Sequence, residues 1–363
     1  MAKHGSFRDF DWFLLLFVLL ICAIGTVQIY SATHATKFVG FHIKQLYWIS
    51  AGVGLMFLVS LVNYQSLLEN IHWAYIVSVI SLVVVKLFGT KALGARRWIS
   101  LHGFHFQPSE WVKLVMIIAI AKFCSDVYLR GVRWLDIFKL AALVGVPMLL
   151  VLVEPDLGTA LTYIPAAVVC LFLAGLRFKQ AAIILIVGTV AVIPVWKHVL
   201  KPYQKDRLTS FMDPGSDPRG SGYQILQSKI AVGAGGLTGR GIAQGSQTQG
   251  AFLPIPHTDF IFASFCEEHG FVGALFVLLL YFIVLMRLIQ DAQTAPDRAG
   301  TFLVMGVVAI LVFHILVNVG MVVGFMPVTG IPLPLMSYGG SSVLFTFLAL
   351  GMVMNIRMRR FVN

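Results

Sequence analysis

Ten apolar segments, each close to the length of a membrane span, constrain the fold of this chain more than any other feature. A helix rises about 1.5 Å per residue, so roughly 20 apolar residues cross the hydrocarbon core of a bilayer. A helix also satisfies its own backbone hydrogen bonds there. The sequence therefore predicts an all-α polytopic membrane protein with ten transmembrane helices, at about 12–30, 46–62, 71–88, 109–125, 138–153, 159–176, 180–196, 259–286, 301–324 and 338–356.

Composition agrees with this class, because only 12% of the 363 residues are charged, against roughly 25% in soluble domains. The segment 12–30 is of full span length and lacks a small-residue cleavage site, so we expect a first span and not a signal peptide. The net charge of +11 is scattered between apolar segments. That distribution favours anionic membrane lipids over nucleic acid as its counterpart.

The connections on the same side of the membrane as the N-terminus contain more Lys and Arg than the short connections on the opposite side. By the positive-inside rule, both termini are expected to be cytoplasmic. One long extracytoplasmic loop, about 197–258, then connects spans 7 and 8 within a single membrane domain, 1–363. Its middle, 222–236, places Tyr223, Leu226 and Ile230 on one helical face, which predicts a short helix at the membrane interface.

Ionisable residues at membrane depth are costly and indicate function or a specific partner. In "QPSEWVKL", Pro108 suits a first helical turn, and Glu110 and Lys113 share one face at spacing i, i+3. They form either an ion pair that helps the helix enter the membrane or part of a ligand site. Arg97, in "GARRWI", is either an interfacial anchor or a phosphate ligand.

Two further acids, Glu154 and Asp156 in "EPDLGTAL", lie between two apolar segments. A tight turn at Pro155 accounts for them adequately. Two acids in so short a connection, on the same predicted face as the other groups, are also compatible with a cavity wall.

The stretch "HTDFIFASFCEEHG" opens the eighth span with His257, Thr258 and Asp259, and carries Glu267 and Glu268 two turns further in. Thr and Asp are good N-cap residues, so capping alone explains Asp259. The two glutamates either face a polar cavity or bond to a neighbouring helix.

Before the last span, "MPVTGIPLPLMSYGGSS" carries three prolines followed by a glycine pair. These residues predict a re-entrant loop, since non-helical backbone at this depth must line a cavity or be buried in protein. NH groups around Ser337, Gly339 and Gly340 suit a diphosphate.

These motifs, in this order and together with "GYQILQSKIAVGAGGLTGRG", resemble the SEDS family of shape, elongation, division and sporulation proteins from about residue 94 onward. The resemblance implies a peptidoglycan glycosyltransferase that joins lipid II into β-1,4 glycan strands outside the bacterial cytoplasmic membrane, releasing undecaprenyl diphosphate. It implies a class B penicillin-binding protein and the elongation machinery as partners. It also places the family's essential aspartate at Asp259, its membrane Glu and Lys at Glu110 and Lys113, and its acidic loop residue at Asp156.

The expected chemistry is attack of an acceptor 4-hydroxyl on C1 of the donor sugar, with Asp259 as general base. The diphosphate leaving group needs its charge neutralised by Arg97, Lys113 or Arg207, or by a divalent cation such as Mg2+ or Mn2+. No metal ligand is identified from the sequence.

The sequence is compatible with other functions as well. A lipid II flippase without bond chemistry is compatible with the same acids, and nothing excludes a scaffold that recruits the penicillin-binding protein. Division and sporulation members share the motifs, although the short segments at both ends favour the elongation branch.

Overall fold

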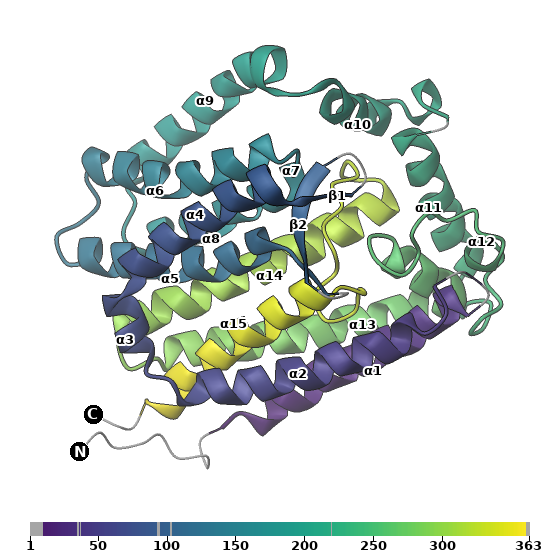
Figure 1. The fold of residues 1–363 in the computed structure, drawn as a ribbon, viewed down its shortest axis with the longest axis horizontal. Coiled ribbons are helices and arrows are strands. Elements are labelled where there is room, and N and C mark those ends of the chain that lie inside the picture. The colour runs from purple at the N-terminus through teal and green to yellow at the C-terminus, as the bar shows by residue number, and fades with distance from the viewer. Residues whose placement is uncertain are drawn as a thin grey trace.

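The structure is a computed structural model that describes residues 10–34, 36, 38–92, 95–101, 104–218 and 220–360. Its helices are bundled side by side, with one small sheet between them (Figure 1). The elements are α1 Trp12–Thr33, α2 Phe41–Leu61, α3 Tyr64–Glu69, α4 Ile71–Phe88, β1 Thr90–Ala92, β2 Ala95–Leu101, β3 Phe104–Phe106, α5 Pro108–Tyr128, α6 Trp134–Val153, α7 Leu157–Leu161, α8 Tyr163–Leu173, α9 Phe178–Pro194, η2 Val195–Val199, α10 Pro202–Met212, η3 Pro214–Ser216, α11 Ser221–Gly235, α12 Ser246–Gln249, α13 Ile261–Gln293, α14 Arg298–Val323 and α15 Gly340–Met358.

Each of the ten predicted spans coincides with one of these helices or, for 159–176 and 180–196, with a pair of consecutive helices. Eight helices of the described chain are long and apolar enough to cross a membrane. The other two predicted spans are α5, which carries four charged residues, and the short α7–α8 pair. The class of polytopic helical membrane protein is confirmed, while the number of spans stays a prediction.

A small antiparallel sheet occupies the connection that the sequence left as a loop between α4 and α5. The strand order is β1-β2-β3, with Thr90 paired to Trp98 and Ile99 paired to Phe106. Strands this short give a weak sequence signal, because their pairing depends on neighbouring strands and not on a long apolar run. The sheet places Arg97 against the turn between α6 and α7.

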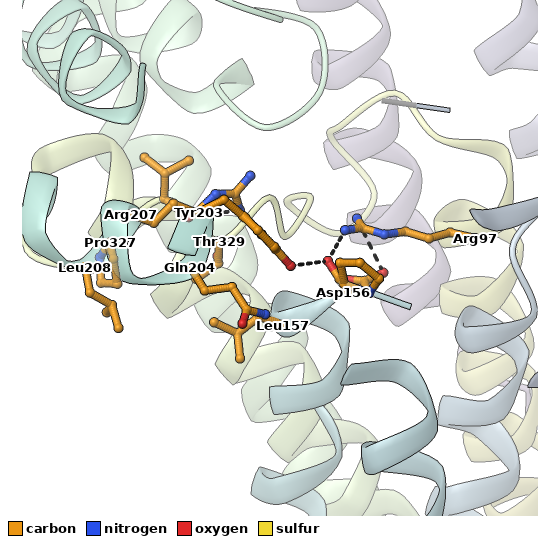
Figure 2. Close-up of a pocket in the computed structure, with 11 residues that line it drawn as sticks. Arg97, Asp156, Leu157, Tyr203, Gln204, Arg207, Leu208, Pro327 and Thr329 are labelled. Carbon is orange, nitrogen blue, oxygen red and sulfur yellow. Dashed lines mark hydrogen bonds and ion pairs between the residues drawn. The ribbon is translucent and has the colours of Figure 1, made fainter. Parts of the chain in front are cut away.

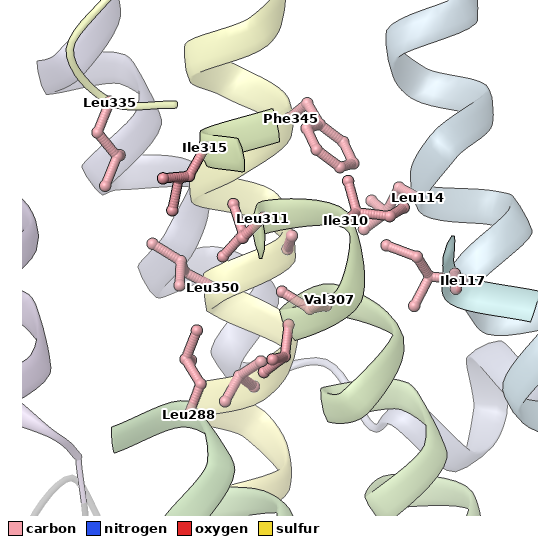
Figure 3. Packing of buried hydrophobic residues seen from close by; sticks show 14 of the residues in the cluster. Leu114, Ile117, Leu288, Val307, Ile310, Leu311, Ile315, Leu335, Phe345 and Leu350 are labelled. Atoms are coloured by element: carbon pink, nitrogen blue, oxygen red, sulfur yellow. The ribbon is translucent and has the colours of Figure 1, made fainter. Parts of the chain in front are cut away.

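The core is centred on α14, which packs against α5, α8, α11, α13 and α15. Figure 3 shows buried side chains of α5, α14 and α15 meeting in one apolar cluster. By contrast, only 6% of the span that contains α9 is buried, and this helix lies at the edge of the molecule (Figure 1). Labelled core residues are Leu114, Ile117, Leu288, Val307, Ile310, Leu311, Ile315, Leu335, Phe345 and Leu350.

Both ends of the described chain meet at one end of the bundle. Asp11, at the start of α1, forms ion pairs with Arg287 at 2.6 Å and with Arg357 at 2.8 Å, and Arg357 also pairs with Asp291. The prediction that both termini share a side is confirmed for these ends. The terminal segments that favoured the elongation branch include residues 1–9 and 361–363, which lie outside the described residues.

The helix predicted at 222–236 is present as α11, and it packs on the protein through a face other than the predicted apolar one. Ile225, Ser228 and Ala231 are buried, whereas Leu226 and Ile230 are exposed. The Ser228 hydroxyl donates to Val322 O of α14 at 3.0 Å. Small residues allow this close approach, while the placement of Leu226 and Ile230 at the membrane interface stays a prediction.

Helix α13 is interrupted at Gly270, which has φ +66°. The segment 236–241 enters the interruption: Phe271 N donates to Gly236 O at 2.9 Å, and Arg240 N donates to Glu267 O at 3.0 Å. A side chain at position 270 would collide with the backbone of this segment. Glycine therefore allows the long connection to dock into α13.

Candidate active site

A cleft opens where the sheet, the turn between α6 and α7, helix α10 and the segment before α15 come together (Figure 2). These parts of the chain are far apart in sequence, and each contributes polar groups. The cleft is lined by Arg97, Pro155, Asp156, Leu157, Tyr203, Gln204, Arg207, Leu208, Pro327, Val328 and Thr329.

Asp156 is fixed in this cleft by three neighbours. It is the N-cap of α7, where Oδ1 accepts from Thr159 N at 3.2 Å. Its Oδ2 accepts from Gln107 Nε2 at 3.1 Å and lies 3.9 Å from Arg97 Nη1. The carboxylate therefore caps a helix and also presents negative charge to the cleft.

Arg97 holds the turn between α6 and α7 through its guanidinium. Nε donates to Glu154 O at 3.0 Å, and Nη2 donates to Pro155 O. The Glu154 side chain is buried, and burial together with the nearby Asp156 charge raises its pKa to about 8, against the opposing effects of Arg97 and Lys86. Glu154 is therefore mostly protonated at neutral pH and adds little negative charge to the site.

Helix α10 covers the cleft from the other side. Tyr203 donates its hydroxyl to Pro155 O at 3.0 Å, and Arg207 Nη1 donates to Val328 O at 3.2 Å. Figure 2 shows Arg97 and Arg207 on opposite sides of the Tyr203 ring. Two guanidinium groups thus flank one opening that also contains Asp156.

Asp259 lies beside this cleft, but not as a helix cap. The N-cap of α13 is Phe260, with no side-chain capping bond, so the capping interpretation of Thr258 and Asp259 is wrong. The chain turns before the helix, and the Asp259 carboxylate lies against Gly330, where an added Cβ would be 3.5 Å from Oδ2. Gly330 directly follows Thr329 of the cleft wall.

The pKa of Asp259 is raised to about 6, because burial outweighs the lowering effect of the Arg207 charge and the Asp156 charge adds to the rise. Among the described residues, none donates a hydrogen bond to this carboxylate. A partly buried, unbonded carboxylate with a pKa near neutrality can accept a proton from a bound hydroxyl group.

The segment before Asp259 is held by the loop that precedes α15. Ser337 Oγ donates to Thr258 O at 2.8 Å, and Tyr338 N donates to His257 O at 2.9 Å. The His257 ring is buried between the rings of Phe38 and Tyr338, and burial lowers its pKa to about 4. His257 is therefore a neutral packing residue at physiological pH.

The glycine pair is attached to α2. Gln45 Nε2 donates to Ser337 O at 3.1 Å, and its Oε1 accepts from Gly339 N at 3.4 Å. An added Cβ at Gly340 would be 2.8 Å from Trp48. In this conformation the NH groups of Ser337 and Gly339 are bonded within the protein, so they are not directed at a ligand.

Glu110 and Lys113 form the predicted ion pair, at 2.8 Å, but they do not line the cleft. The Lys113 side chain is fully buried, with its ammonium 4.4 Å above the Phe345 ring and 3.4 Å from His314 Nε2. Burial inside the helix bundle separates this pair from the open site.

Glu267 and Glu268 bond to neighbouring segments, as one of the two interpretations expected. Glu267 accepts from Gln247 N at 2.7 Å and from Thr248 N at 3.0 Å. Glu268 accepts from Ser31 Oγ of α1 at 2.5 Å. Both glutamates fasten the loop before α13 and helix α1 to α13, and neither lines the cleft.

Three polar residues in or near the site, one lining the cleft and two on α14 behind it, were not found by sequence reasoning. Tyr203 lies in a polar segment without a recognisable motif. His314 and Asn318 are polar residues spaced i, i+4 within the apolar run 301–324. That spacing places them on one face of α14. Two polar residues on one face of an apolar helix indicate that this face contacts polar groups of a neighbouring segment.

Comparison with known proteins gives concordant results. The sequence model of the cell cycle protein family of FtsW, RodA and SpoVE matches residues 11–361. The peptidoglycan glycosyltransferase MrdB of Escherichia coli (strain K12) is 37% identical over 348 residues, which cover 96% of this chain and 93% of MrdB. Stage V sporulation protein E of Bacillus subtilis (strain 168) is 37% identical over 358 residues, which cover 95% and 96% of the two chains.

The fold is also similar to a solved structure. A chain of a peptidoglycan synthase complex, described for its coordination of polymerization and crosslinking, superimposes with a TM-score of 0.84. It is 34% identical, and the match covers 97% of this chain and 98% of that chain.

Proposed function

We infer that this chain, which belongs to the FtsW, RodA and SpoVE family of cell cycle proteins, performs its chemistry in the cleft beside Asp259. It is a peptidoglycan glycosyltransferase, as are its relatives over nearly the full length of both chains. The observation that carries the assignment of the site is the convergence of Asp259, Asp156, Arg97 and Arg207 from four separate segments.

Asp259 acts as the general base. The acceptor of a growing glycan strand presents a sugar hydroxyl, and lipid II presents an anomeric carbon joined to diphosphate. The carboxylate takes the hydroxyl proton as the oxygen attacks this carbon, and the bond to diphosphate breaks. Inversion at the carbon converts an α-linked donor to a β-1,4 product without a covalent intermediate.

Arg97 and Arg207 stabilise the diphosphate as its charge accumulates. Guanidinium groups bind phosphate oxygens in a bidentate manner, and they remain charged at any physiological pH. Lys113 does not share this task, because its ammonium group is buried against Glu110 and His314. The Asp156 carboxylate orients the Arg97 guanidinium group by their ion pair and so holds its positive charge at the cleft.

We also propose that Mg2+ or Mn2+ accompanies the diphosphate. No group of three or more His, Cys, Asp or Glu residues suited to a metal occurs in the part of the chain that the structure describes. Asp156 and Asp259 offer oxygen ligands, which these ions prefer, and diphosphate oxygens supply others. Comparing polymerisation in EDTA with polymerisation in added Mg2+ or Mn2+ tests this requirement.

The proposed setting is the bacterial cytoplasmic membrane, with the cleft on the extracytoplasmic side and a class B penicillin-binding protein as partner. The similar peptidoglycan synthase complex couples polymerization with crosslinking, which supports such a partner. Elongation, division and sporulation relatives have comparable identity, so we assign elongation only as part of this proposal.

The deciding experiment is polymerisation of lipid II by the purified protein together with its partner. We expect Asp259→Asn to abolish strand synthesis, whereas Asp206→Asn, which alters an exposed carboxylate next to Arg207, leaves it intact. Strand synthesis by a folded Asp259→Asn protein at the wild-type rate would remove Asp259 from the mechanism. Translocation of labelled lipid II without strands would support a flippase instead.

A further inference from the structure

The buried amide of Asn318 contacts the backbone of the candidate general base. Asn318 Nδ2 donates to Asp259 O at 3.0 Å and to Ile331 O at 2.8 Å. The side chain is fully buried, in the middle of the C-terminal half of α14. Because both amide hydrogens are used on backbone carbonyls, the side chain joins the residue that carries the base to the segment facing it.

One turn earlier on the same face of α14, His314 contacts the same segment. Its Nδ1 lies 3.2 Å from Pro332 O, and its Nε2 lies 3.4 Å from the ammonium of Lys113. A carbonyl oxygen only accepts and an ammonium only donates, so the ring must carry its proton on Nδ1 and be neutral. His314 therefore links the Glu110–Lys113 ion pair to Pro332, next to Ile331.

We propose that Asn318 and His314 are positioning residues, which set the place of Asp259 and connect it to the buried Glu110–Lys113 pair. This proposal rests on the assignment of Asp259 as general base. Neither Glu110 nor Lys113 lines the cleft, so the pair does not contact the substrate there. The proposal gives this ion pair an indirect role, through the position of Asp259.

The chemistry of general base catalysis explains why such support matters. Proton transfer requires the carboxylate within hydrogen-bond distance of the hydroxyl, and small displacements are costly. The Asp259 side chain has no hydrogen-bond donor of its own among the described residues, so its place depends on its backbone. That backbone is held by Asn318 on one side and, through Thr258 O, by Ser337 on the other.

The test compares two asparagines that make the same kind of contact. Asn355 of α15 also donates its amide to two backbone carbonyls, Ser60 O at 2.6 Å and Val62 O, but at the opposite end of the bundle near the chain termini. Asn318→Leu removes two such bonds at similar side-chain volume, and Asn355→Leu removes two such bonds together with the one that its Oδ1 accepts from Tyr64 N at 3.2 Å. Turnover of lipid II, its KM and the melting temperature are measured for both in the presence of the partner.

We expect Asn318→Leu to lower kcat by about tenfold or more with KM changed less than about twofold, and Asn355→Leu to lower the melting temperature with kcat nearly unchanged. An unchanged kcat in Asn318→Leu, or equal losses of kcat in both variants, overturns the proposal. If Asp259→Asn makes strands normally, the assignment of the base fails and the positioning role falls with it, whereas loss of strands in Asp259→Asn together with an unchanged kcat in Asn318→Leu overturns the positioning role alone.

A second variant covers the case in which Asn318→Leu does not fold. Asn318→Asp has nearly the same shape and, when protonated, still donates one hydrogen bond. Once ionised, its carboxylate opposes the two carbonyl oxygens. The charged groups that act on Asp259 are Arg207 and Asp156, and His314 lies one turn before position 318 on α14; this substitution alters none of these side chains.

We therefore expect the ratio of Asn318→Asp to wild-type kcat to fall as the pH rises and the introduced carboxyl group ionises. A ratio that does not change with pH contradicts the proposal. On the Lys113 side, His314→Gln keeps one acceptor and one donor and should retain most of the kcat, whereas His314→Leu should not. Equal kcat in these two variants removes His314 from the positioning role.

Discussion

The pH dependence of polymerisation is expected to report the environment of Asp259 directly. A pKa of about 6 means that the carboxyl group is roughly half ionised at pH 6, about one tenth at pH 5 and about nine tenths at pH 7. Because a general base works as the carboxylate, kcat/KM should rise with pH through this range. An ordinary aspartate, with a pKa near 3.9, would already be fully active at pH 5.

Two substitutions should move this midpoint in opposite directions. Arg207 lowers the pKa of Asp259 and Asp156 raises it, so Arg207→Gln should shift the midpoint to higher pH and Asp156→Asn to lower pH. A unit charge on the order of 10 Å away, at an effective dielectric constant of ~20, is worth about 1.7 kcal/mol, or up to about one pKa unit. Asparagine still caps α7 at position 156, which limits structural damage.

The assay measures initial rates of strand formation from lipid II between about pH 4.5 and 8, at constant ionic strength and with the same partner. Both variants lower the rate, but only the position of the midpoint matters here. Titration of the substrate is the same for every variant and cancels in the comparison. A wild-type midpoint near 4, or shifts of the same sign in the two variants, would refute the assignment of Asp259 as base.

Three further predictions concern stability. Burial penalises the Asp259 carboxylate, so above pH 6 Asp259→Asn should raise the free energy of unfolding by up to about 3 kcal/mol, measured as a higher melting temperature than that of the wild type. This gain should disappear as the pH falls below about 4. Lys113→Met leaves Glu110 buried without its partner and should cost about 3–5 kcal/mol, of which Glu110→Gln in the same chain restores a large part; equal melting temperatures for the single and double variants would contradict this. Asp11→Asn should release the start of α1 from Arg357, which faster hydrogen exchange of the first turns of α1 would show; unchanged exchange there would argue against the ion pairs as a clamp.

Much of the fold could be predicted because membrane spans are a local property of the sequence. The helices α1, α4 and α15 begin and end within about four residues of the predicted spans. The first turn at Pro108 and the Glu110–Lys113 pair follow from spacing within one helix, and both are confirmed. The helix α11 was predicted for the same reason, although its buried face was not.

Parts of the site could not be predicted because they depend on contacts between distant segments. The capping interpretation of Asp259 failed because the chain before α13 is held by Ser337 and Asn318, which turns the carboxylate toward Gly330. Nothing local in "HTDFIF" indicates those partners. The same holds for Lys113, whose complete burial results from its packing against α14 and α15.

The sequence by itself determined that this chain crosses a membrane repeatedly and which acids stand at the ends of its helices. Hydrophobicity over about 20 residues is sufficient for that. Only the tertiary structure decided that Asp156, Arg97 and Arg207 share one cleft beside Asp259, while Glu110 and Lys113 are sealed inside the bundle. A helix presents polar groups on a fixed face, but the packing of its neighbours decides whether that face meets water, a substrate or another helix.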